Sequence, residues 1–261
     1  MPYKIAVANE KGGVAKTTSV VSLAGALVEM GHRVLVVDLD PQANLTLALG
    51  LKPKDVTHSV AQVLLNSLDP KEVIRTTEVE NLDLLPSNAE MGLAERFLPV
   101  RQSYDTILRS SLSNNLPYDY ILFDCPPALG AITLNAITAA DMLVIPTQAE
   151  YFSAYALKSM MSAIRKVRDQ SNPNLNYRVF ITMYDRRNRT HRTLLEQLQT
   201  TFGNDGLLET IIETDTKLRE SPIVGIPIMY YVSRTRSAEQ YRALAQELIH
   251  DVEKIKVRTA A

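Results

Sequence analysis

Cysteine, long apolar runs and excess charge of either sign are scarce in this 261-residue chain. The single cysteine, Cys125, excludes an internal disulfide and argues against a shared iron–sulfur cluster that needs two ligating cysteines from each subunit. No apolar run approaches the roughly 20 residues that span a bilayer. Met1–Lys4 leads directly into a strand-like run, so we expect no signal peptide. The formal net charge of −1 indicates no class of partner by itself.

Short apolar runs and helical patterns alternate along the chain. The apolar runs are continuous, which is typical of strands buried on both faces of a parallel sheet. We therefore predict an α/β fold, with a mostly parallel, doubly wound sheet flanked by helices, and one domain over residues 1–261. A polar segment around 52–81 predicts a helical insertion, and the pattern around 238–256 predicts a C-terminal helix. The predicted strands are 5–8, 34–37, 82–85, 121–123, 143–145 and 179–181, and the other predicted helices are 17–30, 89–109, 151–168 and 190–201.

A phosphate-binding loop is predicted between the first strand and the first helix, with the sequence Lys11-Gly12-Gly13-Val14-Ala15-Lys16-Thr17-Thr18. The ordinary motif G-x-x-x-x-G-K-[ST] does not fit, because Glu10 and Ala15 occupy its two glycine positions. The variant K-G-G-x-x-K-[ST] fits, and Lys11 is its second lysine. The alternative is a glycine-containing turn with two solvated lysines, but the strand before it and the helix after it favour a nucleoside triphosphate site.

Each residue type in this loop has a chemical reason. Gly12 and Gly13 lack a Cβ and let successive backbone N–H groups turn inward around a polyphosphate. The helix that follows directs its positive end and free N–H groups at the same anion. Lys16 would place a charge at the β/γ oxygens, and the Thr17 hydroxyl could hold Mg²⁺.

Three aspartates follow predicted strands, namely Asp38, Asp40 and Asp124. The carboxyl ends of parallel strands share one edge of a sheet, so we expect these side chains to gather near the phosphate loop. Carboxylates beside a polyphosphate repel it unless a metal intervenes, and Mg²⁺ is the natural choice. The alternative is that each aspartate caps a turn, but three of them beside this loop favour a metal site.

The variant loop resembles that of the ParA/MinD family, the deviant Walker P-loop ATPases. The likeness covers about residues 3 to 250 and is strongest toward short ParA proteins of the Soj type. The similar segments besides the loop are Val36–Asn44, Ile121–Pro127, Leu134–Ala136, Ala139–Asp141, Val144–Pro146, Gly225–Ile228 and Ser237–Tyr241.

The resemblance implies an ATP hydrolase with ATP and Mg²⁺ as cofactors. Lys11, Lys16, Asp40 and Asp124 match the family's catalytic residues, and Asp40 matches the one that orients or deprotonates the attacking water. Residues matching Asp38 and Asp124 support the metal, together with the Thr17 hydroxyl. The lysine matching Lys11 crosses a face-to-face homodimer and touches the nucleotide of the other subunit, so the resemblance implies a dimer assembled by ATP.

The resemblance is weaker where the base is bound. Soj-type chains usually carry Pro-Arg-Asn in the segment that contacts adenine, and this chain reads Glu213-Thr214-Asp215 there. A preference for ATP over GTP therefore follows from the family, with Glu213 and Asp215 as candidate contacts. Asp215 could accept a hydrogen bond from the adenine amino group.

A basic stretch indicates a second function. Residues 158–192 hold nine Lys or Arg against two acidic residues, in a chain that is otherwise acidic. Clustered Lys and Arg attract phosphate backbones without reading sequence, so we predict nonspecific binding to double-stranded DNA. Arg187 and Lys217 fall where Soj-type proteins place such residues. An ordinary helix surface or a partner-binding surface is the alternative. The candidate DNA contacts are Arg186, Arg187, Arg189, Arg192, Lys217 and Arg219.

The resemblance further implies a cytoplasmic, nucleoid-associated protein of a prokaryote, whose hydrolysis is stimulated by a ParB-like partner and positions a chromosome, plasmid or other cargo. A MinD-like membrane ATPase is one alternative. However, the spacing of Ile249, Val252 and Ile255 favours a helix packed on its own domain, so we expect no stable membrane association. A metabolic P-loop ligase of the same fold is the other alternative, and a substrate-sized pocket beside the γ-phosphate would favour it.

Overall fold

A computed structural model describes residues 1–113 and 116–260, and within them eight strands form one sheet. The strand order is β3-β4-β2-β5-β1-β6-β7-β8, and all neighbours are parallel except the short edge pair of β3 and β4. The α/β fold with a mostly parallel sheet is therefore confirmed. The strands are β1 (Tyr3–Val7), β2 (Val34–Asp38), β3 (Arg75–Thr76), β4 (Leu82–Leu85), β5 (Tyr120–Asp124), β6 (Met142–Gln148), β7 (Asn176–Tyr184) and β8 (Leu207–Glu213).

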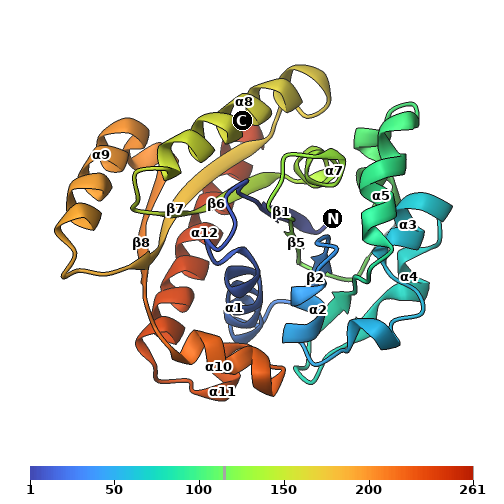
Figure 1. Cartoon of the computed structure of the whole chain (residues 1–261), viewed down its shortest axis with the longest axis horizontal. Coiled ribbons are helices and arrows are strands. Elements are labelled where there is room, and N and C mark those ends of the chain that lie inside the picture. The colour runs from blue at the N-terminus through green and yellow to red at the C-terminus, as the bar shows by residue number, and fades with distance from the viewer. Residues whose placement is uncertain (114–115, 261) are drawn as a thin grey trace.

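Helices cover both faces of the sheet (Figure 1). One layer contains α3 (Val60–Asn66), α5 (Met91–Phe97), α6 (Ile107–Ser111), α7 (Ala131–Ala139) and α8 (Ser153–Gln170). The other layer contains α1 (Lys16–Glu29), α2 (Asn44–Ala48), α11 (Ile228–Tyr231) and α12 (Arg236–Ala260). The remaining helices are α4 (Pro70–Val73), α9 (Arg189–Gly206) and α10 (Lys217–Val224).

The central strands are apolar on both faces because each face meets a helical layer. Ile5 and Val7 of β1 pack into one core, whereas Ala6 between them packs into the other. All five residues of β2 and of β5 are buried. This explains why these strands read as continuous apolar runs, and it leaves only their carboxyl ends to carry polar side chains.

The predicted helix over 89–109 is wrong. The segment contains α5, two 3-10 turns (Leu98–Val100 and Tyr104–Thr106) and α6. Pro99 interrupts the helical hydrogen bonds, and Ser103 adopts a left-handed backbone with φ of 53°. The elements that were not predicted are α2, α7, α10, α11, β3 and β8. In β8 the glutamates and Thr210 break the apolar run that identified the other strands.

The last helix, α12, packs on α1 and β8. Leu248 and Val252 are buried, and Ile249 and Ile255 pack partly buried against the same core. Among the described residues, no helix combines the length and the apolar character that crossing a membrane requires. The apolar side of the C-terminal helix is therefore occupied by the protein's own core.

Candidate nucleotide-binding site

The phosphate loop lies at the carboxyl end of β1, and its backbone is turned by two left-handed residues. Gly13 has φ of 73° and Ala15 has φ of 64°. Helix α1 begins at the next residue, Lys16, so its first N–H groups face the loop. The Lys16 ammonium donates to the Lys11 carbonyl at 3.1 Å and is nearly buried. Burial lowers the pKa of Lys16, while the negative charge of Asp124 opposes that shift.

Two contacts that span long sequence distances hold the loop, one through Asn9 and one through Thr182. The Asn9 side chain accepts from the Lys11 N–H at 3.0 Å and donates to the Pro146 carbonyl at 2.9 Å. The Thr182 hydroxyl donates to the Val14 carbonyl at 3.2 Å. Sequence reasoning missed Asn9 and Thr182, although a buried polar residue directly after or inside an apolar strand was a signal for both.

Ala15 is strained, since a left-handed backbone costs a residue with a Cβ roughly 1–2 kcal/mol. We expect Ala15→Gly to raise the free energy of unfolding by about 0.5–1 kcal/mol, after allowing for the greater chain entropy of glycine. Urea denaturation would measure this. The matched control, Ala24→Gly in the middle of α1, should lower the free energy of unfolding by about 1 kcal/mol or more. A fall for Ala15→Gly would contradict the strain.

Asp124 and Asp38 end neighbouring strands and are paired in register. The Thr17 hydroxyl donates to Asp124 Oδ2 at 2.7 Å, so the predicted metal ligands Thr17 and Asp124 are in contact. Asp124 Oδ1 is buried and has no hydrogen-bond partner among the described residues. Burial, and then the charge of Asp38, raise the pKa of Asp124 well above its usual range. A buried carboxylate with an unused oxygen fits a Mg²⁺ site to which the Thr17 hydroxyl would also contribute.

Asp38 is placed differently, because both of its oxygens already accept hydrogen bonds. Oδ2 accepts from the Thr46 N–H at 2.8 Å and from its hydroxyl at 2.7 Å, and Oδ1 accepts from the Asp40 N–H at 3.1 Å. Burial raises the pKa of Asp38 to about 7, against the opposing effect of these hydrogen bonds. In this structure Asp38 shapes the turn that carries Asp40. Thr46, which sequence reasoning missed, connects this turn to α2.

Asp40 lies in the loop after β2, about 8% exposed. Its Oδ1 accepts from the Gln42 N–H at 2.9 Å. The Ser87 hydroxyl donates to the Asp40 carbonyl at 2.8 Å and so ties this loop to the segment after β4. Asp40 therefore lies at the same edge of the sheet as the phosphate loop, with its carboxylate held by one backbone N–H.

The two lysines of the loop have distinct surroundings. Lys16 lies inside the loop, whereas the Lys11 side chain reaches outward and is one-quarter exposed. Its ammonium donates to Gln148 Oε1 at 2.9 Å and to Glu150 Oε2 at 2.5 Å, both at the end of β6. Neither Gln148 nor Glu150 was predicted. The structure therefore brings the predicted loop residues together but gives Lys11 a partner in its own chain.

The predicted base contacts are found at the end of β8. Glu213 is buried, and its carboxylate pairs with Arg186 at 2.8 Å and Arg236 at 3.0 Å. Asp215 is partly exposed and accepts from the Lys217 N–H and the Ser237 hydroxyl, each at 2.9 Å. Glu213 thus anchors arginines from two distant segments, and Asp215 is the more accessible of the two carboxylates.

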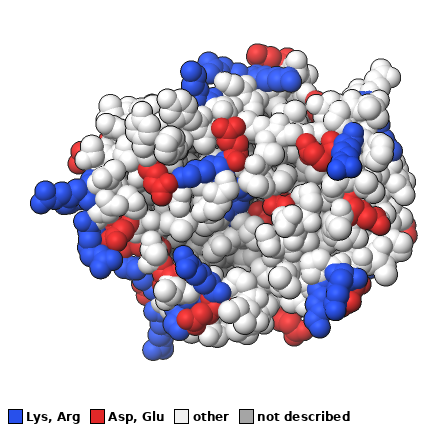
Figure 2. Space-filling view, viewed as in Figure 1, with Lys and Arg blue, Asp and Glu red and all other residues white. Residues whose placement is uncertain are grey.

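The predicted DNA-contacting residues lie in α9, α10 and the loop before α9. Figure 2 shows Lys and Arg gathered along the edge between these helices, with acidic side chains among them. Arg187 pairs with Asp185 at 3.0 Å, and Lys217 pairs with Glu220 at 2.7 Å. Hydrogen bonds from Arg187 hold the pKa of Asp185 at about 2. Exposed Arg189, Arg192 and Arg219 have no ion-pair partner within the described part of the chain.

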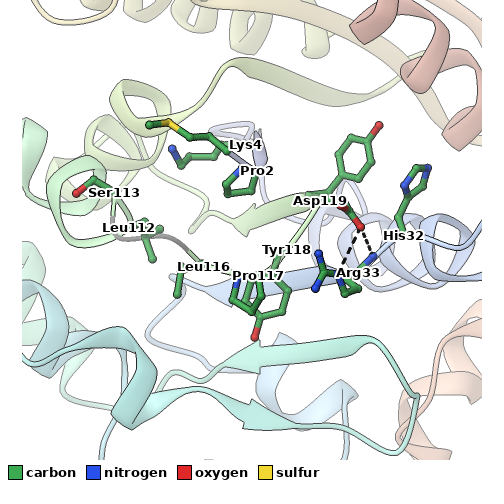
Figure 3. Close-up of a pocket in the computed structure, with 12 residues that line it drawn as sticks. Pro2, Lys4, His32, Arg33, Leu112, Ser113, Leu116, Pro117, Tyr118 and Asp119 are labelled. Atoms are coloured by element: carbon green, nitrogen blue, oxygen red, sulfur yellow. Dashed lines mark hydrogen bonds and ion pairs between the residues drawn. The ribbon is translucent and has the colours of Figure 1, made fainter.

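Two pockets are relevant to the site: one is remote from the phosphate loop, and the other adjoins it. One, of about 650 Å³, lies at the amino ends of the strands and is lined by residues including Lys4, Arg33 and Tyr118 (Figure 3). It contains none of the predicted site residues. The other, of about 720 Å³, lies beside the start of α1 and is lined by residues including Thr17, Leu47 and Ile223.

Comparisons with known proteins agree with this geometry. The family model for an AAA domain matches residues 3–177. The chain is 39% identical to the sporulation initiation inhibitor protein Soj of Bacillus subtilis, over 94% of this chain and 97% of that protein. It is 36% identical to the chromosome partitioning protein ParA of Caulobacter vibrioides, over 94% and 93% respectively. A crystal structure of cobyrinic acid a,c-diamide synthase from Mycobacterium smegmatis, with a bound ATP analog and magnesium, superposes with a TM-score of 0.85 at 33% identity, over 97% of this chain and 96% of that one.

The two-lysine loop, the aspartates at the strand ends and these likenesses over nearly the full chain have one explanation: the protein belongs to the ParA/Soj family of deviant Walker P-loop ATPases.

Proposed function

We propose that this protein is a partition ATPase, which dimerises on Mg-ATP, binds DNA nonspecifically as the dimer and releases it after hydrolysis. The observation that carries the proposal is the different placement of the two loop lysines. Lys16 is enclosed by its own loop, and Lys11 lies at the surface beside Glu150. An outward lysine is available to a nucleotide held by a second copy of the chain, which would make ATP part of the dimer interface.

Mg²⁺ fits the site because Asp124 Oδ1 is buried and has no hydrogen-bond partner among the described residues, while Asp124 Oδ2 accepts from the Thr17 hydroxyl. Thr17 and Asp124 would hold the ion, and Asp38 would support it by fixing the turn before Asp40. Among the described residues, no group of three or more His, Cys, Asp or Glu is arranged to hold a metal. The remaining ligands would therefore be phosphate oxygens and water. When bound, the ion neutralises charge on the β- and γ-phosphates.

The residues of this chain would divide the reaction among them. The Lys16 ammonium binds and orients the phosphates, together with the backbone N–H groups of residues 12–18, which include those at the start of α1. Asp40 accepts a hydrogen bond from the attacking water and takes its proton. Lys11 donates to the phosphates of the partner's nucleotide, where it stabilises charge that develops as the bond to the leaving oxygen breaks.

The base would lie near the ends of β7 and β8. The Glu213 carboxylate is already taken by Arg186 and Arg236. We therefore assign the hydrogen bond from the adenine amino group to Asp215, or to backbone groups beside it. Competition between ATP and GTP for a fluorescent analogue would measure the preference.

DNA binding would use the six basic residues in and before α9 and in α10. Binding should require ATP, since a dimer doubles the number of phosphate contacts, and should be indifferent to DNA sequence. The structure adds a distinction within the set. Asp185 and Glu220 partly neutralise Arg187 and Lys217, so Arg189, Arg192 and Arg219 present the least compensated charge.

We expect Arg187→Glu and Lys217→Glu to weaken DNA binding strongly while leaving ATP-driven dimerisation unchanged. Gel-shift titrations with ATP and Mg²⁺ at several salt concentrations would measure this. The slope of log affinity against log salt should fall by about 1 for each DNA phosphate that the variant no longer binds. The matched control is Lys71→Glu, which makes the same charge reversal at an exposed lysine of α4. DNA affinities equal to the control would remove both residues from the DNA surface.

A ParB-like partner would accelerate hydrolysis and so couple DNA release to movement of a chromosome, plasmid or other cargo, on the nucleoid in the cytoplasm of a prokaryote. The MinD-like alternative makes a different prediction. Wild-type protein that ignores DNA at low salt, but pellets with anionic liposomes in ATP and Mg²⁺, would favour a membrane role. The packing of Leu248 and Val252 in the core argues against a free amphipathic tail.

A metabolic ligase is the second candidate, favoured by the pocket of about 720 Å³ beside Thr17 and by the name of the Mycobacterium smegmatis relative. An amide-forming enzyme that takes nitrogen from glutamine needs a reactive thiolate. The only cysteine, Cys125, is buried, and burial raises the pKa of its thiol. ADP release stimulated by a carboxylic acid with ammonium, and not by DNA, would favour the ligase.

A further inference from the structure

Helix α7 begins without a cap of its own, because its N-cap residue is Gly130. Its first two N–H groups, those of Ala131 and Ile132, donate to the two carboxylate oxygens of Glu95, at 2.8 Å and 3.1 Å. Glu95 lies on α5, 36 residues earlier in the chain. A negative charge at a helix N-terminus is favourable, and this carboxylate satisfies two N–H groups that otherwise lack partners.

The glycine at position 130 is needed for space. Its φ of −88° is open to any residue, but a Cβ built there would lie 1.7 Å from Glu95 Oε1. Any side chain at 130 would therefore displace the carboxylate from the end of α7. The Glu95 contact and the absence of a side chain at 130 depend on each other.

The start of α7 is connected to the proposed metal site by one short loop, residues 125–130. This loop follows Asp124, which accepts from Thr17. It is tight, since the Thr133 hydroxyl of α7 donates to the Ala128 carbonyl at 2.6 Å and the Ala128 N–H donates to the Pro126 carbonyl at 2.9 Å. Fixing the first turn of α7 therefore fixes the loop that begins at Asp124.

The chain segment that carries Glu95 also contacts the Asp40 loop. Ser87 donates its hydroxyl to the Asp40 carbonyl, and its N–H donates to the Thr46 hydroxyl at 2.9 Å. That hydroxyl in turn donates to Asp38. Residues 87–97, which we call the bridging segment, thus contact both the Asp40 loop and the first turn of α7, which directly follows the Asp124 loop.

We propose that Glu95 is a positioning residue for ATP hydrolysis: through the N-terminus of α7 it holds the Asp124 loop in register with the Asp40 loop. The inference rests on the proposed ATPase mechanism, in which Glu95 acts through its contacts with the first turn of α7. Its loss should lower kcat while KM for ATP changes little, because the phosphate loop is anchored elsewhere, by Asn9 and Thr182.

A double-mutant cycle tests the proposal. We expect Glu95→Ala and Gly130→Ala each to lower kcat about tenfold, and the double variant to be no worse than the poorer single one, because both changes remove the same contact. Glu95→Gln, which keeps one acceptor, should lie between wild type and Glu95→Ala. Glu90→Gln is the control, since Glu90 is on the same segment but contacts Gln62. Effects on kcat that multiply in the double variant, or a wild-type kcat for Glu95→Ala, would overturn the proposal.

Hydrogen exchange provides a readout that does not depend on catalysis. The amides of Ala131 and Ile132 should exchange about fivefold faster in Glu95→Ala, which is the usual effect of losing a helix cap. ATP with Mg²⁺ should slow exchange of the bridging segment in wild type and not in Glu95→Ala. Failure of the wild-type protein to hydrolyse ATP would contradict the proposed function. Unchanged exchange at Ala131 and Ile132 in Glu95→Ala would instead exclude the role of Glu95, whether or not the protein is an ATPase. Thermal unfolding of each variant would identify loss of folding.

Discussion

Asp40→Ala will bind ATP and assemble into dimers that turn over slowly, if at all. The expected fall in hydrolysis rate is on the order of 10²–10⁴, the usual contribution of a general base. Binding should persist because Thr17, Asp124 and Lys16 contact one another or the loop independently of Asp40. Phosphate release would measure turnover, and size-exclusion chromatography with light scattering would show a dimer that outlasts the wild-type one.

Two further variants separate catalysis from loop structure. Asp40→Asn keeps an acceptor for the Gln42 N–H but cannot take a proton, so it should be as slow as Asp40→Ala. Asp55→Ala, in the exposed 3-10 turn Pro53–Asp55, removes a carboxylate elsewhere and should hydrolyse ATP at the wild-type rate. Turnover of Asp40→Ala within about threefold of wild type would remove Asp40 from the catalytic role.

Substitution of the two loop lysines should cause two different defects. Lys16→Ala should abolish detectable nucleotide binding, because this nearly buried ammonium is enclosed by the loop that surrounds the phosphates. Lys11→Ala should leave binding to the monomer measurable and block ATP-dependent dimerisation, because its ammonium lies at the surface. Titration with a fluorescent ATP analogue and light scattering with ATP and Mg²⁺ would distinguish the two defects.

Lys4→Ala is the control for this pair, since Lys4 lies near the amino end of β1, in the pocket of Figure 3, and the phosphate loop follows the carboxyl end of that strand. It should bind nucleotide and dimerise as wild type does. A Lys11→Ala variant that dimerises normally with ATP would show that this lysine does not act across the interface. A Lys16→Ala variant with wild-type affinity would exclude the phosphate loop as the binding site.

The sequence predicted those parts of the site that follow from strand order and loop chemistry. Residues 11–18 carry a spacing that needs a strand before it and a helix after it. Asp38 and Asp124 end adjacent parallel strands, so the sheet itself brings them into register. The Thr17–Asp124 contact follows from the same edge rule, although 107 residues separate the two side chains.

The remaining parts depend on contacts that local patterns do not encode. Nothing in the sequence around Glu150 indicates a contact with Lys11. The contact arises because β6, which ends just before Glu150, pairs with β1, which ends just before the phosphate loop. The ion pairs of Glu213 with Arg186 and Arg236 could not be predicted either, because only the fold brings these distant segments together. Pro99 interrupts the predicted helix over 89–109, because a proline within a helix lacks the N–H that the helical hydrogen bond requires.

The Lys11–Glu150 pair acquires a further meaning in a twofold symmetric assembly. In a twofold symmetric dimer each contact occurs twice, once in each subunit. Any change in the strength of this pair therefore contributes twice to the free energy of dimer formation. The pair is partly exposed, with side-chain exposures of 25% and 46%, and such a pair is worth about 0.5 kcal/mol. In the proposed dimer Lys11 would have to leave Glu150 in both subunits in order to cross, so removing the pair would shift the dimer dissociation constant by the square of its effect on one subunit, about fivefold in total. Through this duplication, the acid at position 150 would adjust how much ATP-bound protein must accumulate before the proposed dimers form.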